Sequence, residues 1–311
     1  MNIVNEYQLN TIFILLLILI IPAHAGGRPF NLIEINEGIF LHRGTHAAFG
    51  DPDHDDIANI GFIIGDKCVA VIDTGGSVSI GEELHRAIQS TTDKPICYVI
   101  NTHVHFDHVL GNLAFTGNKP EFVGHAKLAD AIEANRDFFL KEFSSYLGSS
   151  PTRQSIIGPT VTVDDTLTID LGNRTLLLTA YPTAHTHTDL TILDQKTGTL
   201  WAGDLVFREH VPVIDGSLKG WLAVLEKLMQ QDVACIIPGH GPPGYSWPEV
   251  AQAHLDYLNK LLNETRKAIA KGMFMEEAVD TIGLDEKDKW QLFDQHHKAN
   301  VSKAFVELEW E

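Results

Sequence analysis

Short apolar, β-branched runs alternate with helical stretches along most of the chain. The segment "NIGFIIGDKCVAVIDTG" holds two such runs on either side of Gly65-Asp66, a pattern typical of a hairpin with a tight turn. Apolar residues at helical spacing predict helices from about Gly81 to Thr92, Ala126 to Leu147 and Leu218 to Gln231. The pattern is mostly helical from Trp247 to the end.

The order of these elements predicts an α/β fold. Two strand-rich halves carry helices at similar places, which favours two sheets packed face to face with helices outside. No low-complexity linker separates the halves, so we expect one domain over residues 26–311. The carboxy-terminal helices are expected to cover the sandwich, and an exposed apolar stripe on them could make a dimer contact.

The first 25 residues have the pattern of a secretory signal peptide. An apolar stretch from Ile12 to Ile21 is too short to span a bilayer comfortably, and Ala23-His24-Ala25 is a small-X-small cleavage site. The preceding residues carry Glu6 and no lysine or arginine, unlike a standard signal. We therefore predict export to the periplasm or secretion, with an uncleaved amino-terminal anchor as the alternative.

Charge and cysteine content narrow the function further. A formal net charge of −18 argues against a nucleic-acid partner. The expected ligand is a small-molecule substrate. Cys68, Cys97 and Cys235 each lie in an apolar run, so all three are interpreted as buried small hydrophobic residues rather than a disulfide framework. Their odd number leaves at least one unpaired within the chain.

The segment "NTHVHFDHVLGN", residues 101–112, places three histidines and an aspartate within six positions. Side chains two apart on an extended strand point the same way, so His103 and His105 can face one metal ion. Asp107 and His108 follow where the strand is expected to end, and a turn could direct them to a second ion. Imidazole and carboxylate ligands suit zinc, and also iron or manganese.

Three further candidate ligands follow later apolar runs: His185 in "TAHTHTD", Asp204 in "WAGDLVF" and His240 in "IIPGHG". The ends of strands are where α/β enzymes commonly place their chemistry. A carboxylate has two oxygens, so Asp204 can bridge two ions about 3.5 to 4 Å apart. His187 is a rival for the role of His185, which we prefer because of its spacing to Leu190.

The H-x-H-x-D-H motif, the later single histidine, the "GD" aspartate and the "PGHG" histidine resemble the metallo-β-lactamase superfamily from about Asn31 to about Gly241. This resemblance implies a four-layer αβ/βα sandwich of two mixed β-sheets with outer helices. It also implies the ligands of two metal ions: His103, His105 and His185 for the first, Asp107, His108 and His240 for the second, and Asp204 between them. Asp73 in "VIDTGG" would support the site without binding metal. Ligating histidines need partners for their second ring nitrogen, and Asp73, Asp189 and backbone carbonyls are candidates.

A closer resemblance, carried by "DIANIGFIIG", "FVGHAKL", "VPVIDGSLKGW" and "IIPGHGP", is to the quinoprotein relay system zinc metallohydrolases. These are exported relatives of a hydrolase encoded in sulfur-oxidation clusters. The resemblance implies a zinc-dependent hydrolase with two Zn²⁺ ions per chain, associated with a periplasmic quinoprotein dehydrogenase. It implies attack on a carbonyl by a hydroxide held between the metals, with Asp107 orienting the nucleophile and Asp204 bridging.

Several alternatives remain at this stage. A barrel amidohydrolase also opens with H-x-H, and a mononuclear iron dioxygenase of the same fold can carry a similar motif. His105 disfavours the di-iron relatives, which commonly place a glutamate there. Within hydrolases, β-lactam and glyoxalase II-like thioester hydrolysis are open, although Asp204 replaces the cysteine common in one lactamase class. A catalytically silent accessory protein that binds a quinoprotein dehydrogenase is the alternative from another class.

Other polar and aromatic residues are expected to have supporting roles. The segment "HAAFGDPDHDD" from His46 to Asp56 is interpreted as a mobile, solvated acidic loop that borders the pocket rather than a third metal site. His125 and His210 are expected to be surface residues or to support the ligands, and Arg43 to be a surface charge. The aromatic residues Trp221, Tyr245 and Trp247 could line a substrate groove, although Trp221 is expected to pack its helix on the sheet.

Overall fold

Two mixed β-sheets form the centre of the molecule in the computed structural model, which describes residues 18–20 and 30–311. The first sheet has eight strands in chain order: β1 (Ile18–Ile20), β2 (Asn31–Asn36), β3 (Ile39–His42), β4 (Ile60–Ile64), β5 (Val69–Ile72), β6 (Ile96–Ile100), β7 (Glu121–His125) and β8 (Val161–Val163). The second has five, in the order β13 (Cys235–His240), β12 (Thr199–Phe207), β11 (Leu190–Asp194), β10 (Thr175–Ala180) and β9 (Thr166–Asp170).

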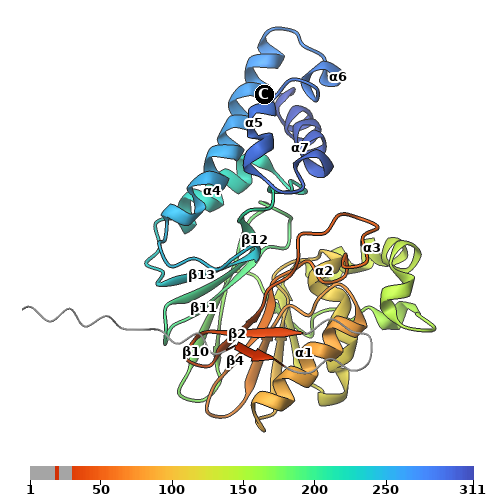
Figure 1. Ribbon diagram of the computed structural model, residues 1–311, viewed down its shortest axis with the longest axis vertical. Helices are drawn as coiled ribbons and strands as arrows, with labels where there is room; N and C mark the ends of the chain where they lie inside the picture. Colours follow the sequence, from red (N-terminus) through yellow and green to blue (C-terminus); the bar gives the residue numbers. More distant parts are fainter. Residues whose placement is uncertain (1–17, 21–29) are drawn as a thin grey trace, which may run out of the picture.

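Helices cover the outer faces of both sheets, which confirms the predicted αβ/βα sandwich (Figure 1). The helices are α1 (Val78–Thr91), α2 (Phe106–Val109), α3 (Leu128–Glu142), α4 (Leu218–Leu228), α5 (Gln252–Ala270), α6 (Met275–Ala278) and α7 (Phe293–Leu308). Within the described part of the chain, five 3₁₀ segments lie between these elements, at Leu110–Asn118, Ser144–Leu147, Arg153–Ser155, Glu249–Ala251 and Leu284–Lys289. The predicted helices are therefore present, with ends shifted by a few residues.

Strand direction follows the connections between strands. β4 and β5 form the predicted antiparallel hairpin, whereas β5 to β8 run parallel. In the second sheet only β12 and β13 are parallel, and α4 connects them. Parallel neighbours need a crossover connection, which here is helical in both sheets.

Alternating side chains of the first sheet fill two separate layers. Ile39 and Leu41 point into the layer between the sheets, where Ile192 of β11 belongs to the same cluster. Phe40, between them in sequence, lies instead in the outer cluster with Leu84 of α1. Both faces of the sheet are buried, so its strands are apolar at nearly every position.

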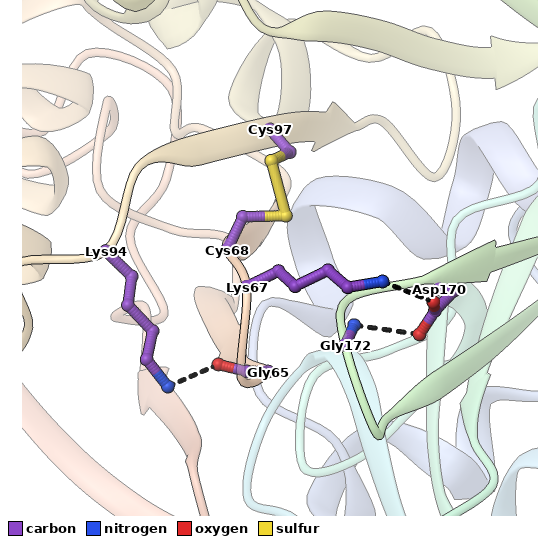
Figure 2. The surroundings of a disulfide bond; sticks show 7 residues. All are labelled: Gly65, Lys67, Cys68, Lys94, Cys97, Asp170 and Gly172. Carbon is purple, nitrogen blue, oxygen red and sulfur yellow. Dashed lines mark hydrogen bonds and ion pairs between the residues drawn. A yellow bond between two sulfur atoms is a disulfide. The ribbon is translucent and has the colours of Figure 1, made fainter.

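Cys68 and Cys97 form a disulfide that ties the start of β5 to β6 (Figure 2). The expectation that all three cysteines are unpaired hydrophobic residues is therefore wrong for this pair. Their Cα atoms are 5.8 Å apart, within the range that a disulfide spans, because the two strands are parallel neighbours. Sequence spacing does not reveal that adjacency. Cys235 is the free cysteine, and it is buried as expected.

Two lysines close to the disulfide hold the turn between β4 and β5 (Figure 2). Lys94 donates to the backbone oxygen of Gly65 at 2.6 Å, and Lys67 pairs with Asp170 of the second sheet at 3.1 Å. The β4–β5 turn is thus anchored to both sheets.

The carboxy-terminal helices pack on α4 and extend beyond the sheets at one end of the molecule (Figure 1). Trp221 of α4 is fully buried against them and donates its indole N–H to the Leu205 oxygen at 3.0 Å, as expected for a residue that packs its helix on the sheet. Tyr257 of α5 and Val301 of α7 belong to the same cluster. Among the described residues, no helix is long and apolar enough to cross a membrane.

Of the predicted signal peptide, residues 1–17 and 21–25 lie outside the described residues. The strand β1 comes from within that segment and pairs antiparallel with β2. Export remains a prediction.

Candidate metal centre

The predicted ligands come from four segments that meet at one edge of the sandwich. β6 ends at Ile100, and the motif from His103 to His108 forms the turn into α2. The expectation that His103 and His105 project from a strand is therefore wrong in detail, because the strand stops before them. Asp204 lies within β12, His240 ends β13, and His185 lies in the loop before β11.

All seven side chains meet in two groups. His103, His105, His185 and Asp204 form the first, and Asp107, His108 and His240 form the second. Within each group the candidate ligand atoms lie within 4.8 Å of one another. The groups contain the side chains that the resemblance implies, with Asp204, the implied bridging residue, in the first.

Asp204 stands between the two groups. Its Oδ2 lies 3.3 Å from His185 Nε2 and 3.3 Å from His240 Nε2. Its Oδ1 lies 3.2 Å from His108 Nε2. One carboxylate therefore faces nitrogens of both groups, the arrangement that a bridging ligand requires.

Asp73 supports two of the histidines from behind. Its Oδ2 accepts a hydrogen bond from His108 Nδ1 at 2.8 Å and another from the Thr102 hydroxyl at 2.7 Å. The Thr102 oxygen in turn lies 3.0 Å from His103 Nδ1, so it can accept from that ring. Asp73 follows β5 with a φ of 52°, a left-handed conformation that is uncommon outside glycine.

The other three imidazoles also have partners on their outer nitrogen. His185 Nδ1 lies 2.8 Å from the Val213 oxygen, and His240 Nδ1 lies 3.0 Å from the Ile57 oxygen. His105 Nε2 lies 3.2 Å from an oxygen of Asp215. Each of the five rings thus has its outer nitrogen held, so that its inner nitrogen faces the centre, where those of His105 and His185 lie 3.1 Å apart.

Orphaned polar atoms mark the space between the rings. Among the described residues, His103 Nε2, His108 Nε2 and Asp204 Oδ1 are buried without a hydrogen-bond partner. Buried polar atoms are nearly always paired, so three unpaired atoms in one cluster point to a group that binds there. Five imidazoles and two carboxylates form a donor set that suits Zn²⁺ and related divalent ions. The residues present therefore fit a pair of metal ions.

The electrostatics of the cluster keep its carboxylates ionised. Burial favours the neutral acid of Asp204, but the surrounding imidazoles, His240 and His108 foremost, outweigh this and hold its pKa well below the ordinary value. Burial of Asp107 is likewise outweighed by His108 and then His240, so its pKa falls to about 2. Ionised carboxylates are the form that binds metal.

The backbone packs tightly around the bridging aspartate. A Cβ at Gly239 would lie 1.8 Å from Asp204 Oδ1. At Gly203, where φ is 50°, a Cβ would lie 2.6 Å from the Cβ of Thr102. These positions accept no side chain without displacing a ligand or its support.

A model of the metallo-beta-lactamase superfamily matches residues 54–240, more than half of the chain. The chain belongs to the metallo-β-lactamase superfamily. A comparison with curated proteins finds no match.

Several solved structures share the fold at low identity. A metallo-beta-lactamase from Pontibacter korlensis is 20% identical over 73% of this chain and 98% of its own, with a TM-score of 0.61. The stereoselective inverting sec-alkylsulfatase Pisa1 from Pseudomonas sp. is 16% identical over 89% of this chain and 50% of its own, with a TM-score of 0.68. A metallo-beta-lactamase from Erythrobacter litoralis is 15% identical over 74% and 96%, with a TM-score of 0.56.

The structure distinguishes the two rival histidines of this superfamily member. His185 is fully buried within the first group, whereas His187 is exposed and lies outside both groups. Asp189, a candidate partner for a ligating histidine, instead accepts hydrogen bonds from the Thr186 backbone and hydroxyl. That expectation is wrong because Asp189 closes a local turn at the start of β11.

Asp215 is a supporting residue that the sequence did not reveal. It lies in "VPVIDGSLKGW", a segment noted only for its resemblance, and no fixed spacing links it to His105. The other carboxylate oxygen of Asp215, Oδ1, pairs with Lys303 Nζ of α7 at 3.1 Å. Only the fold brings these positions together.

The loop after β3 borders the site, as expected, but it is less solvated than its acidic sequence indicates. His54 is buried and stacks on Phe106 with ring centroids 4.8 Å apart. Arg43 pairs with Glu209 at 2.7 Å near the surface, in keeping with the expected surface charge.

His125 and His210 are both buried and lie outside the two metal groups. Tyr245 is exposed, Trp247 packs against the carboxy-terminal core, and neither lines the cavity over the metal groups. The suggestion that they form a substrate groove is therefore wrong.

Proposed function

We propose that this superfamily member is an exported hydrolase that acts on a small-molecule substrate and holds two divalent metal ions, with zinc as the resident metal. The position of Asp204 between the two histidine groups carries the proposal, because a carboxylate so placed can serve both ions. His103, His105 and His185 would hold one ion, and Asp107, His108 and His240 the other.

Zinc, when bound, lowers the pKa of a coordinated water from 15.7 to about 7 and polarises a carbonyl oxygen. The chain supplies the remaining functions. Asp107 is ionised and lies 3.4 Å from the inner nitrogens of both His108 and His240, so it can orient the attacking water by accepting its hydrogen bond. In the overall reaction water adds to a carbonyl, the bond to the leaving group breaks, and the leaving group takes up a proton.

One feature supports export, and another supports the association with a periplasmic quinoprotein dehydrogenase. The Cys68–Cys97 disulfide suits an oxidising compartment. The resemblance to the quinoprotein relay metallohydrolases then supplies the partner. The competing idea of a catalytically silent accessory protein predicts that a variant without metal keeps full biological function while still co-purifying with the dehydrogenase.

The metal content of the purified protein tests the proposal directly. We expect about two zinc ions per chain by elemental analysis, as in binuclear hydrolases. A His185→Ala variant should lose metal, whereas a His187→Ala variant, its matched control two residues away, should keep it. One iron per chain would instead assign the protein to the dioxygenase branch.

A substrate panel tests the reaction. Esters, thioesters, β-lactams and phosphodiesters are compared on the zinc-loaded chain. Turnover of a chromogenic cephalosporin rather than an acyl thioester would favour β-lactam hydrolysis, and the reverse would favour a glyoxalase II-like activity. No turnover in any class by a fully metal-loaded protein would contradict the proposed function.

A further inference from the structure

A cavity of about 220 Å³ opens over the two metal groups. The candidate ligands His105, Asp107, His185, Asp204 and His240 form part of its lining. Pockets that hold drug-sized ligands typically measure about 300 to 1,000 Å³, so this one takes a smaller molecule.

The rest of the lining includes an aromatic wall. Phe49 and His54 come from the loop after β3, Phe106 begins α2, Phe207 ends β12, and His210 lies in the loop that follows. His54 stacks on Phe106 and closes one side. Its Nδ1 is buried without a hydrogen-bond partner, so this wall offers a neutral polar atom as well as apolar rings.

The carboxy-terminal helices complete this wall. His296 of α7 lines the cavity and lies beside His210, with ring centroids 5.2 Å apart. The superfamily match ends at residue 240, so His296 belongs to a part of the chain outside it. The cavity lining therefore includes a residue beyond the segment that the superfamily model matches.

The lining offers no positive side chain to a charged substrate. Among the described residues that line the cavity, none is a lysine or an arginine. Four cations of the described residues stand on segments that contribute to the wall, and each is already bound: Arg43 to Glu209, Lys298 to Asp280, Lys303 to Asp215, and Arg208 to the backbone oxygens of Pro242 and Pro243. Burial holds the pKa of His54 and His296, two lining histidines that belong to neither metal group, below the ordinary value.

We infer that the substrate is a small, uncharged carboxylic ester with an aromatic or branched apolar group, which lies against the wall formed by Phe49, His54, Phe106, Phe207, His210 and His296. This inference rests on the proposed function. Hydrolysis adds one water across the ester, breaks the acyl C–O bond, and yields a carboxylic acid and an alcohol. A carboxylate or phosphate on the substrate would lie unpaired against this wall, at a cost that disfavours carboxylated β-lactams and highly charged thioesters.

A matched pair of esters tests the inference on the zinc-loaded full chain. Phenyl acetate and 4-acetoxybenzoate share the same scissile bond and differ by one carboxylate. We expect kcat/KM to be at least about tenfold higher for phenyl acetate, because the charge loses its hydration without gaining a partner. Equal or faster turnover of 4-acetoxybenzoate overturns the inference while leaving the hydrolase function intact.

Two variants that introduce a lysine on α7 test whether the preference for the uncharged ester arises at the cavity wall. His296→Lys adds a cation to the lining, so it should raise kcat/KM for 4-acetoxybenzoate relative to phenyl acetate. Gln295→Lys adds a positive charge at the exposed neighbouring position and should leave the ratio unchanged. An equal change in both variants would show a long-range charge effect and contradict a role for the wall.

A failure of the proposed hydrolase function can be distinguished from a failure of this inference about the substrate. If the zinc-loaded chain turns over neither ester, binding of acetanilide and 4-acetamidobenzoate, the corresponding amides, is compared by saturation-transfer NMR. Stronger binding of acetanilide, with the difference reduced in the His296→Lys variant, supports the uncharged ligand class although the reaction is not ester hydrolysis. Stronger binding of the carboxylated amide overturns the inference.

Discussion

The side-chain oxygen of Asn300 on α7 accepts a hydrogen bond from the Ile214 backbone N–H at 2.9 Å, and its amide donates to the Pro212 oxygen at 2.6 Å. The loop held in this way also carries Val213 and Asp215, whose oxygens contact His185 and His105. The carboxy-terminal helix therefore sets the position of two groups that orient candidate metal ligands.

Replacing Asn300 by alanine should destabilise the protein and weaken metal binding together. The variant leaves a buried N–H and a buried C=O without partners, which costs about 2 to 4 kcal/mol in the free energy of unfolding. Urea unfolding and competition with a zinc chelator measure the two effects. Asn263→Ala, at an exposed position on α5, is the control and should change neither.

Asp73→Asn should lower metal affinity without unfolding the chain. An amide cannot accept hydrogen bonds at both of its positions, so either His108 or Thr102 loses its acceptor. Loss of such a supporting partner typically costs about 10- to 100-fold in metal affinity. Zinc competition assays on this variant and on Asp66→Asn, in an exposed turn, check the prediction. Unchanged affinity for Asp73→Asn would remove its supporting role.

The Cys68–Cys97 disulfide predicts how many cysteine thiols react with a thiol reagent before and after reduction. Without reductant, the native protein should show almost no reactive thiol, because Cys235 is buried and burial raises its pKa to about 11. Denaturation should expose one thiol, and denaturation with prior reduction should expose three. Three thiols in the unreduced, denatured protein would show that the pair is open.

Removing the disulfide should cost stability but not metal. A double Cys68→Ser, Cys97→Ser variant is expected to lose about 3 to 4 kcal/mol, the magnitude for a loop of this length. Urea unfolding measures the loss. Its zinc content should remain that of the unmodified chain, since neither cysteine belongs to a metal group.

His254 predicts a loss of stability at acidic pH. Burial lowers its pKa to about 3 in the folded chain, whereas an unfolded histidine has a pKa near 6.5. As pH falls below about 6.5, the unfolded state gains a proton before the folded state, so stability declines toward pH 3. Between pH 6.5 and 4.5 this amounts to about 2 to 3 kcal/mol.

A His254→Gln variant removes this titration and keeps an acceptor for the Phe207 N–H. Urea unfolding of both metal-free proteins at pH 6.5 and pH 4.5 should show a smaller decline for the variant. Equal declines would mean that other groups account for the acid sensitivity.

The sandwich could be predicted from local signals, whereas the metal ligands rest on the resemblance and stay a prediction. Apolar alternation defines the hairpin at Gly65-Asp66, and the motif from His103 to His108 supplies four of the seven side chains that meet in the two groups. A helical period predicted α4, and Trp221 packs as that period requires.

Contacts between distant segments could not be predicted in the same way. The pairing of Cys68 with Cys97 depends on β5 and β6 being parallel neighbours, and the contact of His105 with Asp215 spans 110 positions. His296 joins the cavity only because α7 folds back over the end of β12. Single-sequence patterns report period and composition, and neither property records which strands or helices become neighbours.

The close approach of Gly239 to Asp204 has a practical consequence for protein engineering. Mutagenesis libraries aimed at new substrates gain nothing from randomising position 239, because any larger residue there collides with the carboxylate oxygen. Positions 49 and 296 carry lining side chains that belong to neither metal group, so they are suitable sites for diversification. The chain thus separates positions that confine the bridging carboxylate from positions that only line the cavity.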